Sequence, residues 1–393
     1  MKRPVLIGLL LLLTLAACHT PTREARRMLA RAERLADTLP DSTLRLIDSV
    51  MRMEAYLSER ERMDMALLQG KVLFRDASLD DDFSEMLERT ATSPELEHAA
   101  DYYVKKKHFD KATHAALYSG YVQQYYNDKE AAMLSFKDAE HFGELVWDSL
   151  TMARAEYWIG KMLYDDYSET EALSMLKASD RNFGTLLGER AFVQNMEAVA
   201  YMLLKQYDSA ELCLKKSLAF AEQSRPTKAR RKALNNYSVF YQRQGDYAQA
   251  ISCLKQMSDE PDLTNTEKAM LYLNFGKTFA AFGETDSAAV YYQRLEGFLS
   301  DVSMKDETKV SAYGALARFA ESLGKDSLAL QYRDMHENLL FEVMHRHQER
   351  TVYRIQKQYD YESLQNEMNK KLITRQRIIL VISMVMSAMI LLS

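Results

Sequence analysis

The sequence predicts an all-α protein, an α-solenoid of helical hairpins wound as a right-handed superhelix, followed by a long helix and a C-terminal transmembrane segment. Hydrophobic residues make up 47% and charged residues 27% of the 393 positions, which is typical of a folded chain. Only 13 residues are glycine and 6 are proline, too few for the many tight turns of an all-β protein. Alanines at six positions recur every 38 to 41 residues, which indicates a repeat array.

Residues 1–17 are predicted to be a secretory signal peptide. Two basic residues precede an apolar run over residues 5–15, and the small pair Ala16-Ala17 stands directly before Cys18. The Leu-Ala-Ala-Cys stretch resembles the lipobox of bacterial lipoproteins, which implies cleavage before Cys18 and a lipid on its thiol. The alternative is an uncleaved signal anchor in which Cys18 is incidental.

Residues 18–110 are expected to form degenerate helical hairpins. The run that begins at Pro40 has the pattern of a turn followed by a helix. Further helical patterns cover residues 59–73 and 82–88.

The clearest repeat lies within residues 111–335. In its prototype, Tyr241 is the aromatic of a first helix, Gly245 permits a tight turn, and Ala250 stands where two helices cross closely. This spacing resembles the tetratricopeptide repeat (TPR), and Lys205 replaces the turn glycine in one unit. The phased alanines are Ala132, Ala172, Ala210, Ala250, Ala288 and Ala329.

The period is longer than the standard TPR length of about 34 residues and approaches the 40–47 of HEAT arrays. A HEAT-type array is therefore the alternative, but the Gly-Asp-Tyr turn that begins at Gly245 favours TPR. Cys213 and Cys253 lie one repeat apart. Equivalent positions of stacked repeats are ~10 Å apart, whereas a disulfide needs Cα atoms about 4.4–6.8 Å apart. We therefore expect two packed, unpaired thiols.

The C-terminal part contains two predicted segments. Residues 336–377 hold neither glycine nor proline and are expected to form a long linker helix, either a self-pairing coiled coil or a solvated cap of the solenoid. Residues 378–393 carry no charge and would span ~24 Å as a helix, somewhat less than the ~30 Å of a bilayer core. We predict a transmembrane helix whose natural continuation is missing or very short. A buried terminal helix of the fold is the alternative.

The whole arrangement resembles a class of bacterial envelope TPR lipoproteins. The shared features are the stretch that begins Pro40-Asp41-Ser42 and the terminal membrane helix. Some members of that class continue inside the cell into a signalling or DNA-binding module. This resemblance implies a periplasmic body, held by a lipid at Cys18 and by the C-terminal helix.

No catalytic motif emerges from the sequence. It contains no P-loop, nucleophile elbow or dinucleotide-binding turn. His345 and His347 would point to different sides of a helix, so joint metal binding is disfavoured. The acidic run at residues 80–82 is expected to be solvated. The sequence therefore predicts a protein that is not an enzyme and that needs no cofactor and no metal.

The remaining functional surface is the inner face of the solenoid. In the TPR family, the second, fifth, ninth and twelfth positions of each first helix supply the binding groove. Carried over with the phased alanine as position twenty, these positions include Arg154, Tyr157, Lys161, Tyr164, Asn195, Lys232, Asn235, Gln242, Lys277 and Arg318. Such cations and amides would bind a protein or peptide, with an acidic partner favoured. The alternative is an ordinary solvated helix face.

The chain has a net charge of −5, and its basic residues are enriched at both ends. An acidic body disfavours nucleic-acid binding and leaves proteins and membrane lipids as the expected partners. The predicted function is a non-catalytic protein-interaction scaffold of the bacterial cell envelope, with the sensing part of a signalling protein as one form of that role. A surface lipoprotein that captures glycan or another nutrient is the alternative, because the chain contains 23 tyrosines.

Overall fold

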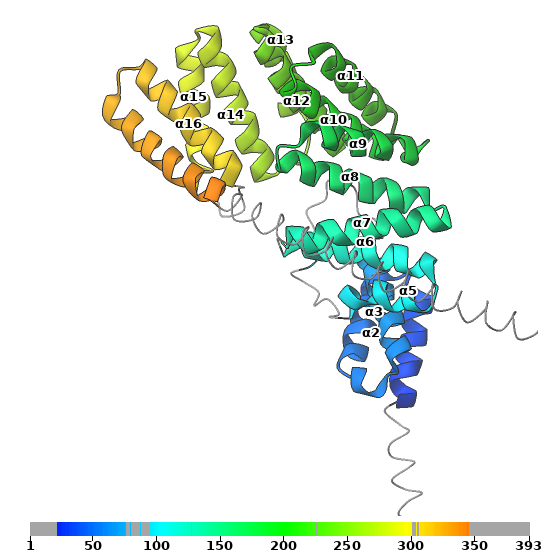
Figure 1. Cartoon of the computed structure of the whole chain (residues 1–393). Coiled ribbons are helices and arrows are strands. Elements are labelled where there is room, and N and C mark those ends of the chain that lie inside the picture. The colour runs from blue at the N-terminus through cyan, green and yellow to red at the C-terminus, as the bar shows by residue number, and fades with distance from the viewer. Residues whose placement is uncertain are drawn as a thin grey trace, which may run out of the picture. The chain divides into compact units, whose positions relative to one another are not determined.

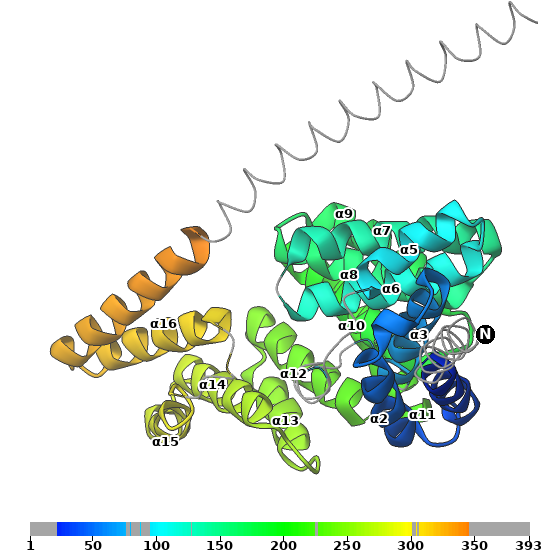
Figure 2. The same cartoon turned by 90° about the horizontal axis from the view of Figure 1, so that it is seen from below.

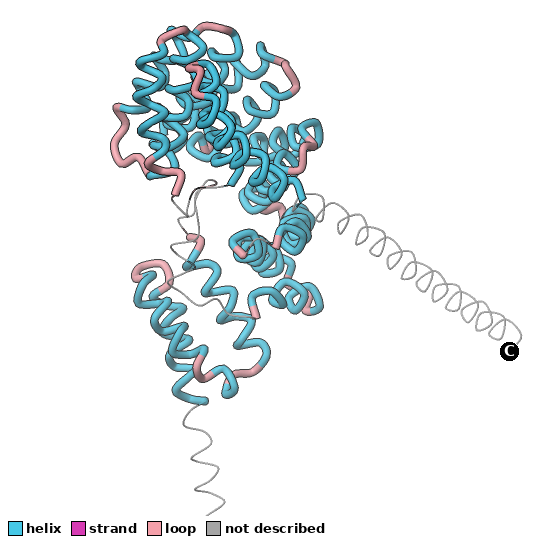
Figure 3. Tube along the Cα trace, turned by 90° about the vertical axis from the view of Figure 1, so that its left-hand side faces the viewer, coloured by secondary structure: helices cyan, strands magenta, loops and turns pink. Residues whose placement is uncertain are grey.

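The computed structural model describes residues 22–75, 79, 87, 95–126, 128–224, 227–300, 304 and 306–345. These residues form helices joined by turns, and no strand occurs among them (Figures 1 and 3). The helices are residues 22–35, α2 (Pro40–Met51), the 3-10 turn η1 (Glu54–Tyr56), α3 (Glu59–Leu73), α5 (Leu96–Lys105), α6 (Phe109–Tyr125), α7 (Lys129–Val146), α8 (Ser149–Asp165), α9 (Glu169–Phe183), α10 (Leu187–Leu203), α11 (Tyr207–Ser224), α12 (Thr227–Gln244), α13 (Tyr247–Ser258), α14 (Asn265–Phe282), α15 (Thr285–Glu296), α16 (Asp306–Ser322) and residues 326–345.

The chain divides into two compact units. Within the described part, the first contains residues 22–264 and 274–288, and the second contains residues 265–273 and 289–345. The division passes through α14 and α15.

The first unit is a stack of helical hairpins in two layers. The first helices of the hairpins, α6, α8, α10 and α12, contact one another directly. The second helices α7, α9 and α11 each pack on the first helix of their own hairpin and on the next first helix. Figure 2 shows α6, α8 and α10 on one side of the stack and α5, α7 and α9 on the other.

Small residues stand where the two helices of a hairpin cross, as the repeat predicts. The alanines at 132, 172, 210, 250 and 288 are fully buried, and Ala329 is 4% exposed. Gly120 on α6 lies so close to α7 that a Cβ atom added to it would be 2.5 Å from the ring of Phe136. A larger residue at position 120 would therefore force the two helices apart.

The hairpin turns share one backbone conformation. Gly245, Gly283 and Gly324 have φ angles of 78°, 87° and 66°. Lys205 has a φ of 58° at the equivalent turn, so the lysine adopts the left-handed conformation that glycine takes elsewhere. The amide after each turn then caps the first helix, as in the 2.9 Å bond from Asp246 N to the carbonyl oxygen of Tyr241.

One side-chain hydrogen bond repeats with the array. The hydroxyl of Ser179 on α9 donates to the carbonyl oxygen of Ala153 on α8 over 2.7 Å. The hydroxyl of Ser217 on α11 makes the same 2.7 Å bond to the carbonyl of Ala191 on α10. Both serines are fully buried, so each bond fixes how a second helix sits on the start of its own first helix.

The two cysteines of the body are unpaired and buried, which confirms the prediction from their spacing. Cys213 is 5% and Cys253 is 8% exposed. Burial raises the pKa of the Cys253 thiol to about 11, so this thiol stays protonated at neutral pH.

Two of the predicted N-terminal helical patterns are helices in the structure, whereas the pattern over residues 82–88 lies outside the described residues except at residue 87. Pro40 is the first residue of α2, and α3 covers residues 59–73. Ser58 begins α3 with a capping box, because its hydroxyl accepts a hydrogen bond from Glu61 N while the Glu61 carboxylate accepts one from Ser58 N.

The second unit has its own aromatic core. Tyr292 on α15 contacts Phe319 on α16, with ring centroids 4.8 Å apart. His336, on the helix over residues 326–345, shares a 2.9 Å hydrogen bond with the carbonyl oxygen of Val310. The last helix is thereby fixed on α16.

Several predicted segments lie outside the described residues. These are the signal peptide, Cys18, the remainder of the linker helix beyond residue 345 and the segment 378–393. Among the helices that the structure describes, none combines the length and the apolar character needed to span a bilayer.

Candidate binding surfaces

The predicted groove residues lie on five first helices. Nine of them, from Arg154 to Lys277, belong to the first unit, whereas Arg318 on α16 belongs to the second unit and is exposed. The structure therefore brings together the residues on α8, α10, α12 and the end of α14.

A chain of side-chain amides links the first helices. Asn236 on α12 donates to Oδ1 of Asn195 on α10 over 3.1 Å, and Asn235 donates to Oδ1 of Asn236 over 3.4 Å. Asn274 on α14 then donates to Oδ1 of Asn235 over 2.8 Å. Asn195, Asn235 and Asn274 are each at most 7% exposed. Asn195 and Asn235, predicted as groove residues, thus connect neighbouring repeats.

Gln242 extends this connection. Its amide donates to the hydroxyl of Thr278 over 2.6 Å and to the carbonyl oxygen of Asn274 over 3.3 Å. Gln242 is half-buried, whereas Thr278 is fully buried. The side chain therefore joins α12 to α14 and keeps part of its surface open to solvent.

The groove residues of α8 divide into core and surface positions. Tyr157 is 1% exposed and packs edge-on against Trp158. The Lys161 ammonium lies 4.5 Å from the centroid of the Trp158 ring, a cation–π contact at the surface of that core. Arg154 pairs with Glu189 on α10 over 3.8 Å. The half-buried Tyr164 has its pKa raised, chiefly by burial.

Three lysines on first helices keep part of their surface open. Lys161, Lys232 and Lys277 are each half-buried. A long lysine chain can cover apolar surface while its ammonium stays at the solvent boundary. The first-helix layer thus carries both the amide chain and three partly exposed lysines.

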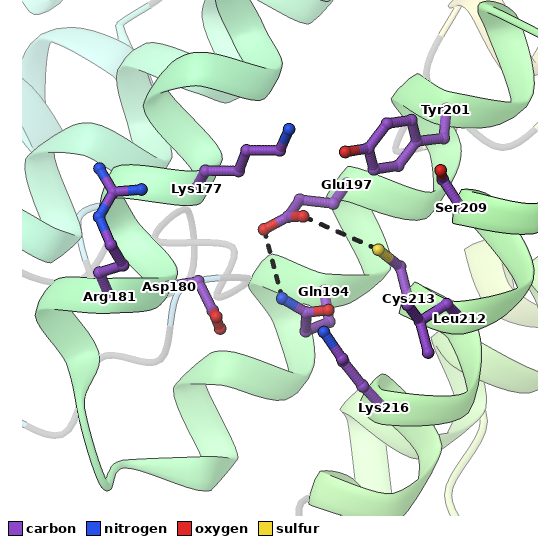
Figure 4. Close-up of a pocket in the computed structure, with 10 residues that line it drawn as sticks. All are labelled: Lys177, Asp180, Arg181, Gln194, Glu197, Tyr201, Ser209, Leu212, Cys213 and Lys216. Atoms are coloured by element: carbon purple, nitrogen blue, oxygen red, sulfur yellow. Dashed lines mark hydrogen bonds between the residues drawn. The ribbon is translucent and has the colours of Figure 1, made fainter. Parts of the chain in front are cut away.

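A second site, which the sequence did not predict, is a pocket of about 300 Å³ between α9, α10 and α11 (Figure 4). Its lining residues are Lys177, Asp180, Arg181, Gln194, Glu197, Tyr201, Ser209, Leu212, Cys213 and Lys216. The pocket opens between two second helices, so it does not belong to the first-helix face.

The floor of this pocket is polar and buried. Glu197 is 5% and Gln194 is 2% exposed. Burial, and then the charge of Asp180, raise the pKa of Glu197 to about 7, while Lys177, Lys216 and a hydrogen bond from Cys213 act in the opposite direction. Burial and the Glu197 charge raise the pKa of Cys213 to about 12, so its thiol remains protonated.

One sequence signal could have revealed the pocket. Glu197 stands at the repeat position that Ile159 and Tyr237 occupy in the neighbouring hairpins. Both of these residues are buried in the hairpin cores, so a carboxylate in that place breaks the pattern. Within the described part of the chain, no group of three or more His, Cys, Asp or Glu side chains could hold a metal ion.

No family model and no curated protein matches this sequence. Among solved structures, the chain is similar to the APC/C hetero-tetramer Cut9-Hcn1, with 14% identity over 79% of this chain and 52% of that chain and a TM-score of 0.50. It is also similar to a tetratricopeptide repeat protein from Parabacteroides merdae, with 15% identity over 74% of this chain and 99% of that one and a TM-score of 0.46. Such identities concern the fold alone. The likeness at a TM-score of 0.50 agrees with the phased helical hairpins, and this chain is a protein with the tetratricopeptide-repeat fold.

Proposed function

We propose that the chain is a non-catalytic interaction scaffold that binds a protein or peptide along the first-helix face of its first unit. The observation that carries this proposal is the arrangement of that face. Buried amides lock α10, α12 and α14 together, and the half-buried lysines Lys161, Lys232 and Lys277 lie on the same layer of helices. A stacked repeat of this kind offers an extended surface that suits a macromolecular partner.

The partner is expected to be anionic. The first helices supply lysines, whereas the whole chain is acidic with a net charge of −5. An acidic peptide would therefore be attracted to this face and repelled elsewhere, and the attraction would weaken as the salt concentration rises.

The proposal places the scaffold in the bacterial cell envelope. The lipobox-like stretch before Cys18 supports a lipid anchor, and the uncharged run over residues 378–393 supports a second, helical anchor. In this arrangement the repeat body is periplasmic, and ligand capture by the body is the sensing step of a signalling protein.

The test is a quantitative pull-down of envelope proteins with three forms of the full chain. The variant Lys232→Ala/Lys277→Ala removes two first-helix cations. The matched control Lys215→Ala/Lys255→Ala removes two exposed lysines from the second helices α11 and α13. Recovery of the partner should fall ~10²-fold or more with the first variant and stay unchanged with the control. Equal recovery from all three proteins would refute a role for the first-helix face.

Thermal melts of the three proteins complete the test. Partly exposed lysines contribute little to stability, so the melting temperatures should agree. A loss of recovery at an unchanged melting temperature would identify a binding defect.

A further inference from the structure

The pocket between α9, α10 and α11 has a floor that is rich in hydrogen-bond acceptors. Gln194 Nε2 donates to Glu197 Oε1 over 3.3 Å, and the Cys213 thiol donates to Glu197 Oε2 over 3.7 Å. The amide contact is long, and the thiol is a weak donor. Gln194 Oε1 is buried and has no hydrogen-bond partner. The floor therefore has three oxygen atoms and few donors for them.

The preceding repeat shows how the chain satisfies a comparable carboxylate. Glu156 on α8 stands at the position equivalent to Gln194, and Asn182 on α9 donates to both of its oxygens over 3.0 and 2.8 Å. The residue equivalent to Asn182 in the next repeat is Phe220, which has no donor. The donor that satisfies a carboxylate on α8 is therefore missing beside Gln194 on α10.

The rim of the pocket has the opposite character. Lys177 and Lys216 are exposed cations on the two second helices that flank the opening. Figure 4 shows Lys177 extending from α9 past Glu197 toward Tyr201, and its ammonium lies 5.4 Å from the centroid of the Tyr201 ring. Asp180, which also lines the pocket, accepts hydrogen bonds from Arg190 on both of its oxygens, over 2.9 and 3.0 Å.

We propose that this pocket binds a free α-amino acid, whose ammonium group occupies the floor and whose carboxylate meets the rim lysines. An ammonium group carries three donors, which matches the oxygens of Glu197 and Gln194. A carboxylate pairs with an ammonium group of the rim, that of Lys177 or that of Lys216. A simple amine would make no ion pair with the rim lysines, and a simple carboxylate would leave the floor oxygens without donors. A volume of about 300 Å³ accommodates a molecule of this size.

The full chain is tested by calorimetry with the standard L-α-amino acids, one at a time. Each amino acid that binds is compared with its analogue lacking the ammonium group and its analogue lacking the carboxylate, such as propionate and ethylamine for L-alanine. Both analogues should bind at least tenfold more weakly than the amino acid. Absence of binding by every amino acid, or equal binding by either analogue, would overturn the proposal.

Variants assign the binding to this pocket. Glu197→Gln keeps the shape of the side chain and should weaken binding at least tenfold, whereas Glu156→Gln in the preceding repeat should not. Lys177→Ala/Lys216→Ala should also weaken binding at least tenfold, and the matched control Lys137→Ala/Lys215→Ala, which removes two exposed lysines from α7 and α11, should not. Helical circular dichroism of each variant confirms that it is folded. Unchanged affinity in folded Glu197→Gln would also overturn the proposal.

The pH provides an independent readout. The charged and titratable groups facing Glu197 are Lys177, Asp180 and Arg181 from α9, Tyr201 from its own helix, and Cys213 and Lys216 from α11. Glu197 must be ionised to pair with an ammonium group, and its pKa is about 7 in the free protein. Affinity should therefore fall up to tenfold per pH unit below 7. Affinity that is constant from pH 8 to pH 5 would contradict the proposed pairing.

Discussion

Asn274 donates a 2.8 Å hydrogen bond to Oδ1 of Asn235, and this bond joins the side chains of two buried asparagines on successive first helices. Asn235 in turn continues through Asn236 to Asn195. Buried amides need partners, so each asparagine constrains the position of the next helix. The first-helix layer is thus fixed by polar contacts as well as by apolar packing.

Replacing Asn235 by alanine should destabilise the protein by about 1–3 kcal/mol, because the amide of Asn274 would remain buried without its acceptor. The exposed Gln249 on α13 supplies the control, and Gln249→Ala should change stability by less than about 0.5 kcal/mol. Urea unfolding followed by circular dichroism measures both. Equal midpoints for the two variants would show that the amide chain adds no stability.

Lys205→Gly should stabilise the protein by up to about 1 kcal/mol. Lys205 has a φ of 58°, a left-handed conformation that costs an L-residue about 1–2 kcal/mol, and glycine avoids most of this cost. Lys255→Gly, in the last turn of α13, should instead destabilise by up to about 1 kcal/mol. Thermal unfolding distinguishes the two directions, and a lower melting temperature for Lys205→Gly would contradict the argument.

Glu197→Gln should change the pH dependence of stability. The pKa of Glu197 is raised from 4.5 to about 7, chiefly by burial and secondly by Asp180. Between these values the folded state binds a proton that the unfolded state has released, so the unfolding free energy falls as the pH rises through this window. The loss amounts to about 3 kcal/mol between pH 4.5 and pH 8. Glu197→Gln should remove that part of the slope.

The control for this experiment is Glu222→Gln, an exposed position on α11. Its stability should vary with pH as in the wild type. Chemical denaturation at pH 5 and at pH 8 provides the comparison, and identical pH slopes for Glu197→Gln and the wild type would exclude a raised Glu197 pKa.

Cys18→Ser should abolish lipid labelling and leave the protein in the membrane fraction through residues 378–393. Deletion of those residues from the Cys18→Ser variant should then release the body. Metabolic labelling with a fatty acid and membrane fractionation measure the two effects. Release of the single variant would show that residues 378–393 are no anchor.

The repeat architecture could be predicted because equivalent residues recur in the sequence at a nearly constant spacing. The spacing of the alanines predicted where the two helices of a hairpin cross. The separation of Cys213 and Cys253 by one repeat predicted two free thiols. The roles of Asn195 and Asn235 could not be read in the same way. A position in the family pattern predicts on which face of a helix a residue lies. Whether its side-chain amide is exposed depends on the side chains of the next repeat, which are Asn236 for Asn195 and Asn274 for Asn235.

The pocket was harder to predict for a related reason. It depends on a donor that is missing, since Phe220 stands where Asn182 satisfies Glu156 in the preceding repeat. Comparison of equivalent positions between repeats identifies Glu197 as unusual. Only the structure shows that Cys213 and Gln194 are its neighbours and that Gln194 Oε1 has no partner.

Site-specific photo-crosslinking tests the binding face most directly. A photoreactive amino acid is placed in turn at Lys232 and Lys277 on first helices and at Lys215 and Lys255 on second helices, and each protein is irradiated in intact cells. We expect one common adduct from positions 232 and 277 and none of that mass from positions 215 and 255. Adducts formed only from positions 215 and 255, or no adduct from any position, would contradict a partner bound along the first-helix face.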